Sequence, residues 1–339
     1  MAYTTINKST AHFNTLLYTA TGTQSVTGAG FQPDMSWVKP RSATGSHYIA
    51  DAVRGATKTI SPNSTSAEGT QNLFTSFDSD GVSLGSDNWS DNRTAVIWNW
   101  KAGGGQGSSN TDGSINTTYT SVNTTAGFSI SSYTGTGSAN STVGHGLGVA
   151  PSMIIVKKLN GSFNWGIYHK SLTAHKIMFF TTGTPDDDAS YWNDVEPTSS
   201  VFNLGSGALT NGSGSTMIAY CFAEKTGYSK FGSYTGNGNA DGTFVYTGFK
   251  PAFLLIKRTD TTKNWFLHDN KRLGYNPKNE YLHPNLNAAE TTSTEVDILS
   301  NGFKFNSSGS GHNGSGGTYV YMAIGQSLVG SNNIPCTAR

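Results

Sequence analysis

The chain repeats nearly the same sequence three times, and this repetition limits the folds that it can adopt. A glycine, a proline, a hydrophobic run and a lysine recur in "GFQPDMSWVKPR", "GLGVAPSMIIVKK" and "GFKPAFLLIKR". A second landmark follows each of them: "TAVIWNWKA", "TMIAYCFAE" and "TYVYMAIGQ". The repeat prolines Pro33, Pro151 and Pro251 are 118 and 100 residues apart. Solenoid units have about 20–50 residues, whereas about 100 residues make one β-sandwich. The period therefore favours repeated whole domains.

The pattern inside each repeat predicts strands. The runs 153–156 and 253–256 are apolar without interruption, which is typical of a central strand covered on both faces. The closing strand of each repeat alternates instead, so one face should point to a core. We expect Trp98, Tyr220 and Met322 on that core face, and Ile97, Ala219 and Tyr321 on the other side. No long segment has a helical period. We predict an all-β protein of three tandem β-sandwich domains, of the jelly-roll or concanavalin-like type.

The repeats also suggest domain boundaries. We expect the first sandwich at 1–103, a linker with the second sandwich at 104–226, and the third sandwich with a C-terminal tail at 227–339. The stretch "GGGQGSSNTDGS" after the first repeat is flexible by composition, as Gly/Ser-rich linkers are.

Composition excludes several classes of protein. Of the 339 residues, 12% are aromatic, which is enough to fill cores. The net charge of +1 gives no reason to expect nucleic acid as a partner. No apolar run reaches the roughly 20 residues that a membrane span needs, and the start has no secretory signal pattern, so we expect no membrane insertion. Cys221 and Cys336 are expected to be unpaired thiols.

Aromatic residues at two kinds of position could bind a ligand. Trp165 and Trp265 each follow the repeat proline by 14 residues, with His47 in that place in the first repeat. They could stack on sugar rings, but their equivalence between repeats favours packing in a core.

Three other aromatic residues are not repeated and stand among Asp, Asn and Ser in turn-like sequence. We predict these three as ligand-contacting residues, with capping of a core edge as the alternative: Trp89, Tyr191 and Trp192.

A polar set recurs in part. Asp51, His169 and Asp269 occupy one repeat position, and Arg54, Leu172 and Arg272 another. A polar site shared by the first and third repeats is one interpretation. An Asp–Arg pair that fixes a surface turn is the favoured one, because such pairs are common.

No motif in the chain carries chemistry by itself. The acidic segment 185–194 lacks EF-hand spacing, so a solvated loop is favoured and calcium binding stays open. The histidines form no zinc pattern, and no P-loop, dinucleotide fingerprint or nucleophile elbow occurs. We therefore predict no enzyme, no catalytic residues, no metal and no cofactor.

The repeat motifs, with "DAVRGATK", "SFDSDGVSLGS", "WNWKAGGG" and "NTTAGFSISSYTGTGSANSTVGHGLGVAPSMIIVKK", resemble a family of virion-associated proteins of tailed bacteriophages, especially marine ones. The resemblance covers almost the whole chain. It implies a structural protein of the virion exterior, tail-associated or fibre-like, with concanavalin-like sandwiches and no transferable catalytic residues.

We therefore expect a tail-associated fibre or adhesin that contacts the polysaccharide of the host surface, beside other phage virion proteins. A head-decoration or capsid-fibre protein is the alternative, and a glycan depolymerase is the third. Tail and capsid locations are not distinguished by the sequence. A homo-oligomer, with a trimer favoured, is expected from cyclic symmetry, and Tyr319 and Tyr321 on the far sheet faces should be exposed to form its interface.

Overall fold

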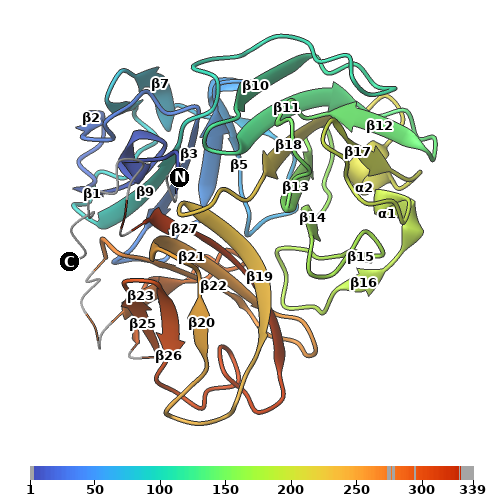
Figure 1. Cartoon of the computed structure of the whole chain (residues 1–339). Helices are drawn as coiled ribbons and strands as arrows, with labels where there is room; N and C mark the ends of the chain where they lie inside the picture. The colour runs from blue at the N-terminus through green and yellow to red at the C-terminus, as the bar shows by residue number, and fades with distance from the viewer. Residues whose placement is uncertain (1–3, 273–275, 277–278, 294, 328, 330–339) are drawn as a thin grey trace.

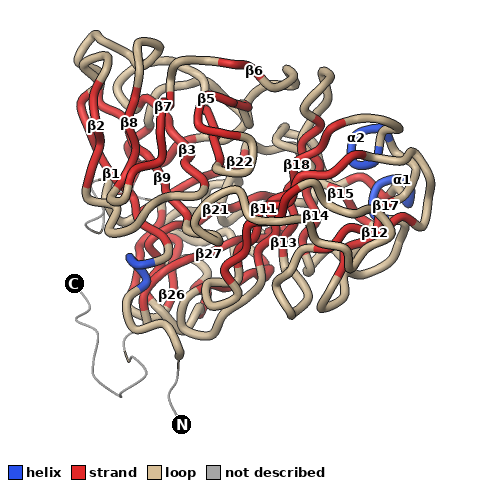
Figure 2. Tube along the Cα trace, turned by 90° about the horizontal axis from the view of Figure 1, so that it is seen from above, coloured by secondary structure: helices blue, strands red, loops and turns tan. Residues whose placement is uncertain are grey.

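The computed structural model describes residues 4–272, 276, 279–293, 295–327 and 329. Most of the predicted C-terminal tail, with Cys336, lies outside the described residues. The protein is all-β, as predicted, with short helices at η1 (Ser9–Ala11), α1 (Ala189–Trp192) and α2 (Ala208–Asn211) (Figure 2). No helix in the described ranges is long and apolar enough to cross a membrane.

Each repeat forms one large antiparallel sheet in which the closing strand lies between the opening strand and the central strand. The first sheet contains β1 (Phe13–Thr19), β9 (Thr94–Trp100), β3 (Met35–Pro40), β4 (Tyr48–Asp51), β5 (Gly55–Ile60) and β6 (Gly69–Thr70), in that order. The second contains β10 (Tyr119–Asn123), β11 (Phe128–Thr134), β18 (Thr216–Phe222), β13 (Met153–Lys158) and β14 (Gly166–His169). The third contains β19 (Ser229–Thr235), β27 (Thr318–Gln326), β21 (Lys250–Arg258), β22 (Trp265–Asp269), β23 (Asn279–Leu282) and β24 (Thr291–Ser293).

Smaller sheets cover the outer faces of these three. They are β2 (Gln24–Thr27), β8 (Gly81–Leu84) and β7 (Phe74–Asp78) in the first repeat; β12 (Ser141–Gly144) and β17 (Val201–Leu204), with a separate pair β15 (Lys176–Ile177) and β16 (Asp186–Asp187), in the second; and β20 (Phe244–Tyr246), β26 (Gly302–Phe305) and β25 (Val296–Leu299) in the third.

Strand register confirms that the repeat prolines occupy matching places. Met35 faces Trp100 and Met153 faces Phe222 in the first pairs of β3 and β13, and Phe253 faces Ile324 at the matching place in β21. Each proline stands two residues earlier: Pro33 and Pro151 lie just before their strands and Pro251 is the second residue of β21, so all three lie near a strand start, where a missing N–H group costs least.

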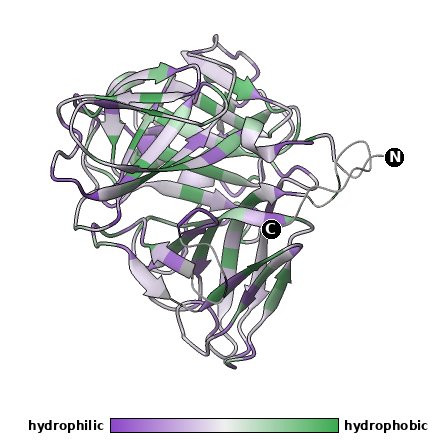
Figure 3. Cartoon of the chain, turned by 90° about the vertical axis from the view of Figure 1, so that its left-hand side faces the viewer, coloured by the Kyte–Doolittle hydropathy of each residue, from purple (hydrophilic) through white to green (hydrophobic). Residues whose placement is uncertain are grey.

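The apolar residues form one inner core and three outer cores. The inner core collects one face of all three large sheets, and its members include Trp98, Tyr220 and Met322. Each outer core lies between one large sheet and its small sheet, and these cores contain Ile97, Ala219 and Tyr321. Figure 1 shows the three repeats in blue-green, green-yellow and orange-red around a common centre, and Figure 3 shows hydrophobic residues along their strands.

The two predicted faces are therefore correct, but both faces are buried. Tyr319 and Tyr321 have exposed fractions of 0% and 3%. The expectation that they form an exposed interface is wrong, because the small sheet β20-β26-β25 covers them.

The second repeat fills the centre in a way that the other two do not. Phe180 packs edge-on against Trp37, Trp165 and Trp265, with ring centroids 6.1, 5.7 and 5.2 Å away. At the matching loop positions the other repeats have Pro62 and Pro284. One large ring thus fills a space that three equal copies could not share.

Ring N–H groups close the three repeats into a circle. Trp165 Nε1 donates to the carbonyl of Ser61 (2.9 Å) and Trp265 Nε1 to the carbonyl of Phe179 (2.8 Å). In the same position His47 Nε2 lies 3.0 Å from the carbonyl oxygen of His283. Each bond runs to the preceding repeat, and the first repeat bonds to the third. The packing interpretation of the two tryptophans is confirmed, since both are buried.

Three matching lysines strengthen the same contacts. Lys39, Lys157 and Lys257 are fully buried, and burial lowers the pKa of each to about 8. Lys157 Nζ donates to the carbonyl of Thr65, and Lys257 Nζ to that of Thr182, at 2.9 and 3.0 Å. Both acceptors belong to the preceding repeat, so buried cations as well as rings join the repeats.

The predicted flexible linker is held by a carboxylate. Asp34 accepts hydrogen bonds from the backbone N–H groups of Ala102, Gly104 and Gly105 at 2.6, 3.0 and 2.7 Å. Asp34 therefore holds the first residues of this segment in place.

Candidate functional site

The partly repeated polar set lies where the large sheets meet. Tyr220 Oη donates to Asp51 Oδ2 (2.7 Å), which joins the second repeat to the first. Trp98 Nε1 donates to Asp269 Oδ2 (2.9 Å), which joins the first repeat to the third. Each aspartate thus accepts a bond from the closing strand of the neighbouring repeat.

The third junction shows why the second repeat departs from the pattern. The matching closing-strand residue there is Met322, whose side chain has no N–H or O–H group. A buried carboxylate opposite it would lack this partner, at a considerable cost. The chain has His169 instead, and its Nε2 lies 3.1 Å from the backbone oxygen of Tyr321. Leu172 replaces the arginine that a carboxylate would need.

The Asp–Arg pairs are buried, so the interpretation as surface turns is wrong. Asp269 and Arg272 have exposed side-chain fractions of 0%, with 2.6 Å between Oδ2 and Nε. Asp51 and Arg54 are also 2.6 Å apart and almost fully buried. These pairs join repeats and offer no open polar site.

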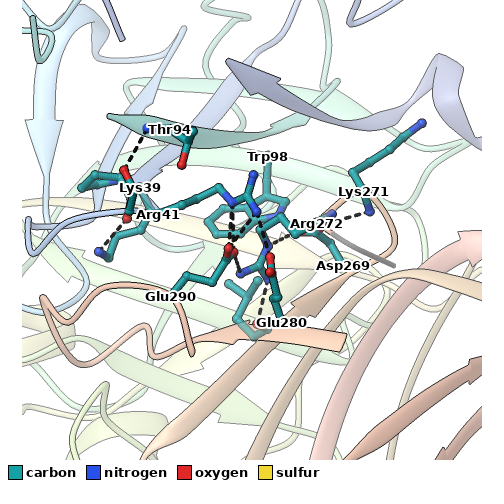
Figure 4. Close-up of polar contacts among 12 residues, drawn as sticks. Lys39, Arg41, Thr94, Trp98, Asp269, Lys271, Arg272, Glu280 and Glu290 are labelled. Atoms are coloured by element: carbon teal, nitrogen blue, oxygen red, sulfur yellow. Dashed lines mark hydrogen bonds and ion pairs between the residues drawn. The ribbon is translucent and has the colours of Figure 1, made fainter. Parts of the chain in front are cut away.

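At the junction of the first and third repeats the ion pairs extend further (Figure 4). Arg272 Nη1 binds Glu290 (2.9 Å), and Arg41 Nη2 binds both Glu290 (2.7 Å) and Glu280 (2.8 Å). Burial and the neighbouring Glu290 carboxylate raise the pKa of Glu280. Two arginines and two glutamates thereby fasten the first repeat to the third.

An open cavity of about 250 Å³ lies at the same junction. We call it the junction cavity. Its walls carry hydroxyl, amide and ammonium groups beside a small apolar part, from Ser9, Thr10, Phe13, Asn14, Thr15, Lys250, Ala252, Asn270, Lys271 and Gln326.

The cavity exists because one side chain is small. Thr15 faces Trp98 in the strand pairing. In the same register Ile130 faces Tyr220 and Phe231 faces Met322. Ile130 and Phe231 are buried in the inner core, so large apolar groups occupy the equivalent positions at the other two junctions.

The polar groups that line the junction cavity differ in whether the protein already provides their hydrogen-bond partners. The amide of Asn14 donates to the carbonyls of Gly28 (3.2 Å) and Ala29 (3.1 Å). Gln326 Oε1 accepts from the backbone N–H of Ser9 (2.7 Å). Thr15 Oγ1 differs: the residue is 95% buried, and its hydroxyl has no hydrogen-bond partner in the described part of the protein. A buried hydroxyl without a partner is costly, and this oxygen is closed to solvent, so Thr15 contributes to the cavity chiefly by its small size.

A second open cavity, of about 270 Å³, lies among the loops around Phe180. Its amides already bind the chain: Asn63 Oδ1 accepts from the N–H of His47, and Asn285 Oδ1 from the N–H of Trp265. These bonds explain the two side chains structurally, so the junction cavity is the better candidate.

The structure does not place the three predicted contact residues in either cavity. Trp192 is buried in the outer core of the second repeat, against Tyr168, which suits the alternative that it packs at a core. Tyr191 is half-buried and packs edge-on against Phe179. Trp89 is half-buried beside Tyr48. Their contact with a ligand stays a prediction.

The acidic segment 185–194 is largely paired with its neighbours. Asp187 binds Lys176 (2.8 Å), and Asp188 caps α1 through the N–H of Ser190 (2.8 Å). Asp194 lies 3.2 Å from His175. Among the described residues there is no cluster of three or more His, Cys, Asp or Glu side chains that could hold a metal.

Sequence reasoning missed the junction cavity, although a signal was present. The opening strands "FNT", "FSI" and "SKF" align by register, so Thr15 occupies the position that Ile130 and Phe231 have in the other repeats. A small polar residue at a position that is large and apolar in the other repeats indicates a gap in the packing. This can be concluded only once that position is known to face another repeat.

Comparisons with known proteins give one result for family membership. A domain of unknown function (DUF7483) matches residues 8–327, which takes in all three repeats as one unit. No curated protein matches the chain. By this match over most of its length, the chain belongs to the DUF7483 family.

Proposed function

We propose that this protein is a non-catalytic binding protein whose junction cavity takes a saccharide. The observation that carries the proposal is an open cavity lined by hydroxyl, amide and ammonium groups, at the only one of the three matching positions that is not filled by a large apolar side chain. Hydroxyl and amide groups beside an apolar surface suit a ligand rich in hydroxyl groups.

We place this function at the exterior of a phage virion, as a tail-associated fibre or adhesin that contacts host polysaccharide. The resemblance of the repeat motifs supports this location, and a surface of low charge rich in Ser, Thr, Asn and Gly suits an exposed structural protein. Several copies on one particle would raise a weak affinity per site. A homo-oligomer, favoured as a trimer, and contact with other virion proteins belong to the same proposal.

We further propose that each large sheet with its small sheet is one β-sandwich domain of the jelly-roll or concanavalin-like type, with boundaries at 1–103, 104–226 and 227–339. The separate outer cores support this division. The inner core, shared by all three, supports their acting as one body.

The test is binding of purified protein to polysaccharide from the host surface, with a variant that fills the cavity. Thr15→Ile copies the residue of the second repeat at this position and should abolish binding. Thr19→Ile makes the same change at the exposed end of β1 and should leave binding unchanged. Equal binding by both variants would contradict the site, and release of reducing ends would contradict the absence of catalysis.

A further inference from the structure

Two lysines make the junction cavity cationic. Lys250 and Lys271 both line it, and its described lining residues include no carboxylate. Figure 4 shows the Lys271 side chain directed away from the ion pairs of Arg272 and Glu290. Neither lysine forms an ion pair within the described part of the chain, whereas the nearby carboxylate of Asp269 is bound by Arg272.

The two cavity lysines have no charged counterpart at the matching positions of the other repeats. By register, the positions of Lys250 and Lys271 correspond to Gln32 and Val53 in the first repeat and to Ala150 and Ser171 in the second. The departures from the repeat pattern therefore coincide: a small residue leaves the space open, and two lysines line it.

Partial burial of Lys250 makes its ammonium group less stable, which favours a bound anion. Burial lowers the pKa of Lys250, because a desolvated ammonium group is less stable. A bound anion would relieve that cost and would form hydrogen bonds stronger than those between neutral groups.

We propose that the junction cavity binds an anionic saccharide unit, with its acidic group held by Lys250 and Lys271 and its sugar ring in the space beside Thr15. This inference rests on the proposed function and names its ligand class. A carboxylate of a uronic acid and a sulfate ester share the chemistry that the two ammonium groups recognise.

Calorimetric titration with three oligosaccharides tests the inference: oligogalacturonate, a sulfated galactan oligomer and the uncharged galactan oligomer. We expect the protein to bind one or both of the charged probes and the neutral probe at least tenfold more weakly. Lys271→Met and Lys250→Met should each lower affinity for the charged probe about tenfold, and Lys271→Arg should retain most of it. Lys58→Met, which removes a half-buried lysine on β5 outside the cavity lining, is the matched control.

The outcomes separate the two proposals. Binding of the neutral oligomer that Thr15→Ile abolishes and the lysine variants leave intact would overturn the anionic ligand but keep the saccharide site. Binding of a charged probe that survives loss of both lysines would also overturn the inference. Failure of all three probes and of host polysaccharide would overturn both. Near-ultraviolet circular dichroism shows whether each variant keeps the native packing. Lys271→Arg keeps the positive charge, so a folded Lys271→Arg protein that does not bind the charged probe would also overturn the inference.

Discussion

Removal of Arg272 should destabilise the protein strongly, because the guanidinium group joins buried charges of the third repeat. It binds Asp269 through Nε (2.6 Å), Glu290 through Nη1 (2.9 Å) and the carbonyl of Leu267 through Nη2 (2.9 Å). It also lies over the ring of Trp98, 5.4 Å from the centroid. Arg272→Met would leave a fully buried carboxylate without its cation, which costs about 3–5 kcal/mol in measured cases.

Urea denaturation followed by tryptophan fluorescence measures this cost. We expect the free energy of unfolding to fall by about 3–5 kcal/mol for Arg272→Met. The double variant Asp269→Asn/Arg272→Met should recover part of the loss, since a neutral amide can still accept from Trp98. Arg93→Met is the control, because its partner Asp91 is an exposed carboxylate and exposed pairs contribute little. A loss for Arg272→Met no larger than that of the control would refute the buried-charge argument.

Three further predictions concern the centre and the joints between repeats. Phe180→Ala should lower the free energy of unfolding by about 3–5 kcal/mol, measured by the same denaturation. A loss no larger than that caused by the same substitution at an exposed phenylalanine would contradict the central role of this ring. Burial lowers the pKa of His169 to about 4 and that of His268 well below 6.5. The unfolded chain then binds more protons, so the free energy of unfolding should fall as pH drops from about 6.5 towards 4. A free energy of unfolding that stays constant over this pH range, both in the native protein and in His268→Gln, would be inconsistent with this. Asp34→Ala should cost about 2 kcal/mol by removing the acceptor of three backbone N–H groups, and unchanged thermal unfolding would contradict that bracing role.

Much of the fold could be predicted from the sequence, because it depends on local pattern. Alternation along the closing strands placed Trp98 and Tyr220 correctly, and the proline landmarks identified matching strand starts. Equivalence between repeats also predicted that Trp165 and Trp265 pack inside, and their burial confirms it.

The relation between repeats could not be read from the same pattern. A buried face looks alike whether it meets its own small sheet or a neighbouring repeat, so Tyr321 was expected to be exposed and is covered instead. The Asp–Arg pairs seemed superficial because their partners, Tyr220 and Trp98, are far away in the sequence. Composition suggested a flexible linker because nothing local shows that Asp34 binds it.

The candidate site was missed for the same physical reason. The junction cavity lies between strands more than two hundred residues apart in the sequence. It can be recognised only by comparison with the other two junctions, where large apolar side chains fill the equivalent space. Unrepeated aromatic residues were a local signal, and for Trp192 that signal reflected core packing.

The most direct test of the account is a crystal structure of the protein with the charged oligosaccharide that binds most tightly in the titrations. The account predicts density for one saccharide unit in the junction cavity, with its acidic group within hydrogen-bonding distance of Lys250 and Lys271 and its sugar ring beside Thr15. Density for the ligand at another place, with the junction cavity holding solvent alone, would contradict it.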